Sequence, residues 1–207
     1  MALRRLGSDK TGWATTVWID PGGTTGWGVM SITPEDLIGD KPLHVAIAHW
    51  ACGDTKGNEN QMASACLELF AMWDDAAIGC EKFVIRKFLQ HAEFLSPVRI
   101  RSKIEYGLWL AEKWEADDEE REEGRPRQLF VQDPSYAKST LTDDRQRNFG
   151  LWEPGGDDKR DAIKHCYAFL SRARQTPRLR YLAWPNLFRT DGTPLKQRAS
   201  AQKKGIH

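Results

Sequence analysis

The chain has no long apolar run, and this absence limits the classes of protein to which it can belong. None of its apolar segments reaches the roughly 20 residues that a membrane-spanning helix needs. The first residues, MALRRLGSDKTGW, carry basic side chains but no apolar segment after them, unlike a signal peptide. We therefore expect a cytoplasmic protein that makes no contact with a membrane.

Cysteine is sparse, and its four positions are far apart without a CxxC pair. A zinc site or a disulfide framework would need closer or paired cysteines. We expect reduced and mostly packed thiols at Cys52, Cys66, Cys80 and Cys166.

Charge of one sign is also lacking, because 30 Lys and Arg residues face 29 Asp and Glu residues and the net charge is +1. The charges are unevenly spread: EADDEEREE at 115–123 is acidic, whereas the chain from Arg172 onward is mostly basic. Both segments are expected to be solvated surface, although the basic one can also hold a polyanion. The sequence shows no internal repeat and no low-complexity linker.

The length of 207 residues favours one domain with terminal extensions. Alternation and turn residues predict strands, and 3.6-residue spacing predicts helices that follow the third, fourth and fifth strands. The last helix is expected to start near Asp158, after a loop rich in Asp and Arg. The predicted strands are 14–20, 26–32, 43–51, 79–86 and 128–132, and the other predicted helices are 60–75 and 96–114.

This order predicts an α/β fold with a mixed sheet: three antiparallel strands first, then parallel strands, with helices on both faces. We expect an N-terminal extension at 1–13, the folded domain at 14–172, and a basic, loosely ordered tail at 173–207.

Four acidic residues stand at the ends of these elements. Asp20 ends the first strand, Glu81 lies in the fourth, and Asp158 and Asp161 are three apart on one face of the last helix. Clustered carboxylates are costly unless cations neutralise them, and magnesium prefers oxygen ligands. Two such ions can activate a water and stabilise a leaving oxygen in phosphodiester cleavage.

Each acid also has a simpler explanation. Asp20 could simply begin a turn and have no other role, Glu81 could face solvent on an edge strand, and Asp158 could cap the helix. Asp161 in the first helical turn would suit the helix dipole. The order and spacing of the whole set carry more weight than any single position.

The first motif, Asp20-Pro21-Gly22 followed by Thr25-Gly26-Trp27-Gly28, resembles the opening strands of the RuvC-type Holliday junction resolvases. Those proteins also carry a glutamate on a later strand, as in CEKF here, and a D-x-x-D-A on the last helix. Asp158, Asp161 and Ala162 match that last pattern. The chain resembles the shortened versions found in bacteriophages more than the bacterial resolvase, which would place it in the cytoplasm of a bacterial host.

The resemblance, which covers about residues 14–170, implies an RNase H-like fold and a crossover junction endodeoxyribonuclease that acts in DNA recombination and repair. It implies that Asp20, Glu81, Asp158 and Asp161 bind two Mg²⁺ ions per site, with Mn²⁺ able to substitute, and that Asp20 bridges the ions. Branched DNA would be the substrate, and no nucleotide cofactor is expected. Symmetric cutting of a four-way junction needs two active sites, so a homodimer is implied, with the 96–114 helix as the expected interface.

Further residues were selected around this set. His165 lies four residues after Asp161 and could contact the attacking water or the phosphate, or could simply pack beside the sheet. Basic residues interleaved with aromatic ones suit a phosphate backbone, although a solvated helix face is the simpler explanation. The expected DNA-binding residues are Arg86, Lys87, Arg99, Arg101, Lys103 and Lys138, the last from a segment that resembles the family's proline-and-lysine stretch.

The chain departs from the bacterial pattern, because the Gly/Arg-rich run that follows this stretch there is not recognisable here. Three alternatives stay open. One is a nuclease of the same fold that acts on flaps, forks or RNA–DNA hybrids, and another is a non-catalytic DNA-binding module. The third is an ASKHA-type ATPase, whose phosphate-binding turn is similar to Gly23-Thr24-Thr25, but that fold needs about twice this length.

Overall fold

The computed structural model describes residues 12–83, 95–116 and 127–195. Its centre is a five-stranded sheet with the strand order β3-β2-β1-β4-β5. β2 is antiparallel to β1 and to β3, whereas β4 is parallel to β1 and to β5. This confirms the predicted mixed sheet. The strands are β1 Ala14–Asp20, β2 Thr24–Ile32, β3 His49–Lys56, β4 Ala77–Glu81 and β5 Leu129–Gln132.

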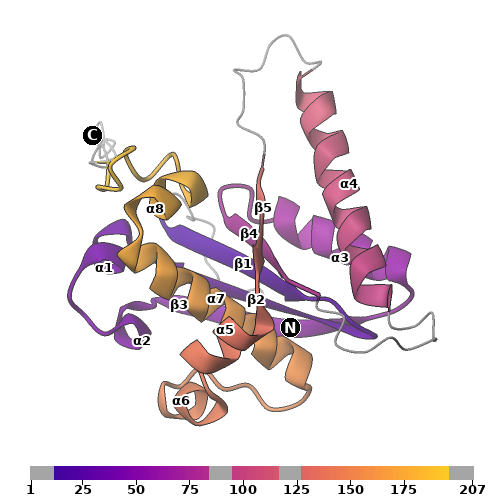
Figure 1. Cartoon of the computed structure of the whole chain (residues 1–207), viewed down its shortest axis with the longest axis horizontal. Helices are drawn as coiled ribbons and strands as arrows, with labels where there is room; N and C mark the ends of the chain where they lie inside the picture. The colour runs from indigo at the N-terminus through magenta and orange to yellow at the C-terminus, as the bar shows by residue number, and fades with distance from the viewer. Residues whose placement is uncertain (1–11, 84–94, 117–126, 196–207) are drawn as a thin grey trace, which may run out of the picture.

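Helices cover both faces of the sheet, as predicted (Figure 1). One apolar cluster, which includes Trp18, Phe169 and Trp184, joins one face to α7 and α8. A second cluster, which includes Val17, Phe70 and Ile104, joins the other face to α3 and α4. The helices are α1 Pro34–Ile38, α2 Leu43–Ala46, α3 Glu59–Ala71, α4 Ser96–Ala116, α5 Pro134–Thr140, α6 Asp143–Asn148, α7 Asp157–Gln175 and α8 Pro177–Ala183.

The third predicted strand, 43–51, is wrong over its first half. Residues Leu43–Ala46 form the short helix α2, and the strand begins only at His49. Leu43 and Ala46 are both buried on the α7 side of the core. They are three residues apart, so one helical turn buries both apolar side chains of a run that alternates in sequence. Short apolar runs of this kind fit either structure.

The loop expected between the fifth strand and the last helix contains two short helices. Asp133 caps α5, with Pro134 at its first position, and Thr142 caps α6. Both caps are ordinary helix start signals, so the sequence did contain the information.

The expected loosely ordered tail is wrong for residues 177–195. α8 forms here, and Trp184 and Phe188 behind it are 1% exposed. The indole Nε1 of Trp184 donates to the carbonyl oxygen of Thr15 at 2.7 Å, so this segment is part of the core. Residues 196–207 lie outside the described residues, as do 1–11 and most of the acidic run.

Among the residues that the structure describes, no helix combines the length and apolar character needed to cross a bilayer.

Candidate active site

Two glycines of the opening motif bring α7 close to the sheet. A Cβ atom on Gly26 would lie 2.2 Å from the carbonyl carbon and oxygen of Asp158. A Cβ on Gly28 would lie 3.0 Å from the backbone of Ala162. Only the missing side chains therefore allow α7 to cross β2 at this distance. The glycines of the Thr-Gly-Trp-Gly stretch set the position of the Asp158 turn.

The sheet register places the other two acids at the same end of the sheet. Asp20 is the last residue of β1 and pairs with Gly26. Glu81 ends the parallel neighbour β4, where it pairs with Gln132 of β5. Since β4 lies between β1 and β5, Glu81 is not on an edge strand. The simpler explanation of Glu81 as an edge residue is therefore wrong.

Asp158 is not the helix cap either. α7 begins at Asp157, and the cap position is Gly156, which has no side chain to make the capping hydrogen bond. Asp158 sits in the first turn, where its carboxylate is near those of Asp161, Asp54 and Glu81. Burial and these charges raise the pKa of Asp158. Asp54, from β3, was not selected from the sequence.

The four predicted acids interact electrostatically. Burial, together with the charges of Glu81, Asp161 and Asp158, raises the pKa of Asp20 from 3.8 to about 8, while Lys138 opposes the effect. A carboxylate with this raised pKa gains strongly from a nearby cation. The structure thus places the other three predicted carboxylates near enough to Asp20 to raise its pKa.

Asp161 differs from the other three because two lysines neutralise it. Nζ of Lys138 lies 2.7 Å from Oδ2, and Nζ of Lys164 lies 2.7 Å from Oδ1. Burial alone would raise the pKa of Asp161, but these two ion pairs outweigh it and lower the pKa. Lys164 also lies 2.6 Å from Oδ1 of Asp143 in α6.

Glu81 has its own partner, His165 of α7, whose Nε2 lies 2.8 Å from Oε2 of the glutamate. His165 is fully buried and stacks on Trp18 with ring centroids 5.4 Å apart. It also contacts Gln132 of β5. Packing beside the sheet and contact with the carboxylate cluster are therefore both true of this histidine.

Lys164 and Gln132 were missed from the sequence. A lysine three residues after Asp161 on a helix is a visible ion-pair signal. Gln132 gave no such signal, because its contact with His165 depends on how β5 packs on α7.

The expected DNA-binding residues divide into three groups. Lys138 lies beside Asp161, at the carboxylates. Arg99 and Lys103 of α4 are instead paired with Glu59 of α3, and Arg101 is paired with Glu105 of its own helix. Arg86 and Lys87 lie outside the described residues.

The four acids supply oxygen ligands of the kind that Mg²⁺ prefers, so the donor set fits such an ion. Within the described ranges, however, no three Asp, Glu, His or Cys side chains are placed closely enough to hold one metal ion together. Glu81 and Asp161 are turned towards His165 and the two lysines.

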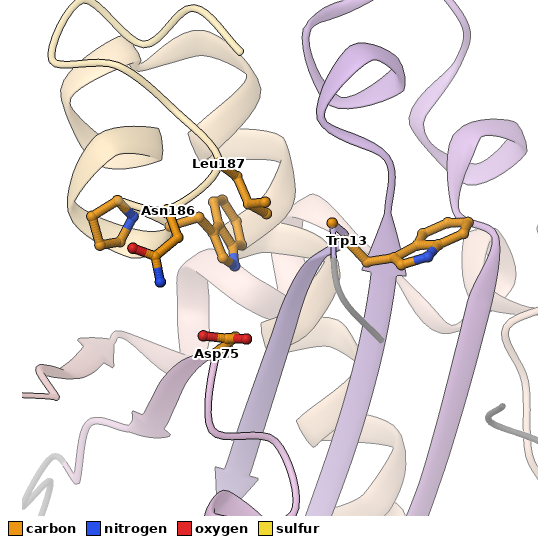
Figure 2. Close-up of a pocket in the computed structure, with 7 residues that line it drawn as sticks. Trp13, Asp75, Asn186 and Leu187 are labelled. Carbon is orange, nitrogen blue, oxygen red and sulfur yellow. The ribbon is translucent and has the colours of Figure 1, made fainter. Parts of the chain in front are cut away.

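One pocket among the described residues lies away from the carboxylates. Its volume is about 240 Å³, and Figure 2 shows Trp13, Asp75, Asn186 and Leu187 around it. Trp13 immediately precedes β1, so the pocket is at the opposite end of that strand from Asp20. None of the predicted site residues lines it.

The strand order 3-2-1-4-5, with acids at the ends of β1 and β4 and at the start of α7, defines an RNase H-like fold. More specifically, the fold is RuvC-like. Thermus thermophilus RuvC in complex with a Holliday junction substrate has a similar structure, with a TM-score of 0.55 and 15% identity over 78% of this chain and 96% of that chain. A second structure of Thermus thermophilus RuvC covers the same shares at 15% identity, with a TM-score of 0.51. No family model and no curated protein sequence matches the chain.

Proposed function

We propose that the protein is a Mg²⁺-dependent, structure-selective endonuclease that resolves branched DNA such as Holliday junctions. The observation that carries this proposal is the position of Asp20, Glu81, Asp158 and Asp161 at one end of a RuvC-like sheet, where burial and the charges of the other three acids raise the pKa of Asp20 to about 8. Without cations, such a cluster only destabilises the fold. The cluster is best explained as a site that binds positive charge.

In this proposal two bound Mg²⁺ ions would supply Lewis-acid chemistry, activating a water and stabilising the 3′ oxygen that leaves. The residues that would hold them are the four carboxylates, since Glu81, Asp161 and Asp158 all influence the pKa of Asp20. Lys138 has a side chain that is half exposed, so it can reach a DNA phosphate at the mouth of the cluster.

The carboxylates would also determine the orientation of the DNA. In this proposal the scissile phosphate lies against the end of β1, because Asp20 and Glu81 are the last residues of the parallel strands β1 and β4. Lys138 on α5 lies beside this edge, next to Asp161. A DNA strand that passes there meets one cation of the protein and the carboxylates together.

A homodimer is the second part of the proposal, because paired cuts in a four-way junction need two active sites. α4 supports it. Its inner face, with Ile100 and Ile104, is fully buried, whereas Val98, Tyr106 and Trp109 are exposed. Exposed large apolar side chains on one helix are typical of an association surface.

The test is a cleavage assay with labelled four-way junction, flap, fork, RNA–DNA hybrid and linear duplex in Mg²⁺. Asp20→Asn should abolish cleavage, whereas the matched control Asp40→Asn, at an exposed aspartate, should cut like the parent. Paired symmetric nicks in the junction alone would support a resolvase.

Other results would point elsewhere. Cutting of flaps, forks or hybrids in preference to the junction would support the alternative nuclease activity. Binding of junction DNA without any cutting would support a non-catalytic module. Equal cleavage by Asp20→Asn and the parent would show that the carboxylate cluster is not the active site.

A further inference from the structure

Two adjacent residues of α7, Lys164 and His165, approach the carboxylate cluster from inside the protein. Lys164 is 7% exposed and His165 is 0% exposed, so neither is available to contact DNA from solvent. We propose that they are positioning residues, which hold one oxygen of each of the Glu81 and Asp161 carboxylates and so determine which oxygen stays available to a cation. This inference rests on the proposed function of the same site.

The hydrogen bonds around His165 define which ring nitrogen carries the proton. Nε2 of Gln132 lies 3.0 Å from Nδ1 of His165 and 3.4 Å from the backbone oxygen of the same residue. A carbonyl oxygen can only accept, so the Gln132 group that faces it is the NH₂, and Nδ1 must accept as well. The ring proton is therefore on Nε2, which donates to Oε2 of Glu81 at 2.8 Å.

This arrangement leaves His165 no free ring nitrogen. Nδ1 is bound by Gln132 and Nε2 by Glu81, while Trp18 stacks on the ring at an interplanar angle of 11°. A histidine held on three sides cannot also activate a water in this position. His165 therefore acts on the reaction through Glu81. Its hydrogen bond restricts the rotation of the Glu81 side chain.

Lys164 does the same for Asp161. Its Nζ lies 2.7 Å from Oδ1 of Asp161 and 2.6 Å from Oδ1 of Asp143, so the ammonium group joins α7 to the start of α6. Two carboxylates compensate the single buried charge of Lys164, and removing one partner of a buried ion pair is strongly destabilising because the other charge is left uncompensated. Asp161 is thereby held on its inner oxygen, and only Oδ2 is directed outwards.

Lys138 contacts that outer oxygen and differs from Lys164 in accessibility. The side chain of Lys138 is 52% exposed, whereas that of Lys164 is 9% exposed. An incoming cation can displace Lys138 into solvent, but it cannot displace Lys164 without opening the core. The two lysines on one carboxylate thus have separate roles: one inner and permanent, the other outer and exchangeable.

The central experiment measures Mn²⁺ binding to the full chain by titration calorimetry without DNA. Lys164→Met and His165→Leu should each bind Mn²⁺ about 10–100-fold more weakly than the parent, the usual effect of removing a group that orients a metal ligand. The controls are Lys41→Met, which removes another ion-paired lysine, and His44→Leu, which removes another stacked histidine. Both should bind Mn²⁺ like the parent.

A conservative variant separates positioning from packing. His165→Gln keeps an N–H donor that can reach Glu81, so it should recover part of the affinity that His165→Leu loses. Lys138→Ala should act in the opposite direction from Lys164→Met and bind Mn²⁺ at least as tightly as the parent, because it removes a competitor from Oδ2. Equal losses in Lys138→Ala and Lys164→Met would overturn the division between the two lysines.

A second readout needs no metal. In ¹⁵N-histidine-labelled protein, which contains five histidines, the His165 ring should show the tautomer with its proton on Nε2. Gln132→Leu should change the Nδ1 signal of that ring alone. A His165 proton on Nδ1 would overturn the proposed contact with Glu81 even if the parent protein binds no ion.

Failure of this inference differs from failure of the proposed function. A parent chain that neither binds Mn²⁺ nor cuts DNA would contradict the nuclease proposal. A parent that does both, with Lys164→Met and His165→Leu binding as tightly, would contradict the positioning role alone. If Lys164→Met does not fold, Asp143→Asn loosens Lys164 from its exposed partner and should give a smaller loss in the same direction.

Discussion

At the scale of single residues, Asp20 contributes to the way in which the stability of the metal-free protein depends on pH. Its pKa is about 8 in the folded chain but 3.8 as an ordinary aspartate. A raised pKa means that the folded state holds the proton more tightly, so this stabilisation is complete below about pH 4 and is lost as the pH rises towards 8. Each unit of pKa difference corresponds to about 1.4 kcal/mol.

Asp20→Asn replaces the carboxylate with a neutral group of the same shape. Without metal at pH 8 we therefore expect this variant to be more stable than the parent by at least about 2 kcal/mol, with little difference at pH 4. Urea unfolding at both pH values with EDTA measures it. Added Mg²⁺ should stabilise the parent more than the variant, and a variant less stable than the parent at pH 8 would contradict the repulsion at Asp20.

At the scale of secondary-structure elements, Gly26 determines where α7 lies on the sheet. Gly26→Ala places a methyl group 2.2 Å from the backbone of Asp158, and neither backbone can yield cheaply. We expect a loss of about 3 kcal/mol or more in the free energy of unfolding, at or above the usual cost of overpacking. Cleavage should fall further than stability alone explains, because Asp158 and Asp161 move with the helix.

The matched control is Gly23→Ala, where a Cβ would meet nothing within 4 Å. That variant should retain both stability and cleavage. Chemical denaturation and the junction assay on the two variants give the comparison, and a neutral Gly26→Ala would show that α7 does not pack on β2 as described.

A separate prediction concerns α8 and the residue that follows it, Trp184, because the sequence suggested a loosely ordered tail where the structure has a packed segment. Trp184→Ala removes a buried side chain and its hydrogen bond to Thr15, and should lower stability by about 3–5 kcal/mol. Leu182→Ala, at a residue of α8 that is 45% exposed, should cost less than about 1 kcal/mol. Thermal unfolding of both variants distinguishes an integral segment from a loose one.

These elements also show what the sequence could predict. β1 is rich in β-branched residues and ends at Asp20, so its extent followed from local signals. The fourth strand was predicted at 79–86, whereas β4 is Ala77–Glu81, so the placement of Glu81 at the same end of the sheet as Asp20 came only from the structure. α8 could not be predicted from local signals, because the segment is short and has few apolar residues. Its residues are buried only because the chain around Trp184 packs on Phe169 and donates a hydrogen bond to Thr15. α2 was predicted as part of a strand, because apolar and polar residues alternate in this short run and such a run fits either structure.

The candidate site could likewise be predicted only in part from the sequence. The four acids were found because their order is encoded in motifs. Gln132 and Asp143, by contrast, become part of the site through contacts between elements that are far apart in sequence. The direction of a side chain such as His165, turned to Glu81 rather than to solvent, is likewise a result of packing on Trp18.

At the scale of the whole molecule, the carboxylates and the exposed face of α4 are separate surfaces. α4 packs on α3 on the face of the sheet opposite α7, and extends beyond the sheet (Figure 1). Tyr106 is 60% exposed and stacks with Trp109, which is 46% exposed. In the proposed homodimer, a two-fold contact through this helix would leave both candidate active sites open to DNA.

Tyr106→Glu combined with Trp109→Glu should therefore convert a dimer into a monomer, because charges at the centre of an apolar contact are not compensated there. Light scattering after gel filtration measures the mass, and Val45→Glu, at a residue 63% exposed on α2, is the control that should stay dimeric. In the junction assay the monomer should give single rather than paired nicks, since each active site retains its own carboxylates. A parent protein that is monomeric at assay concentration, or a double variant that remains a dimer, would exclude α4 as the interface.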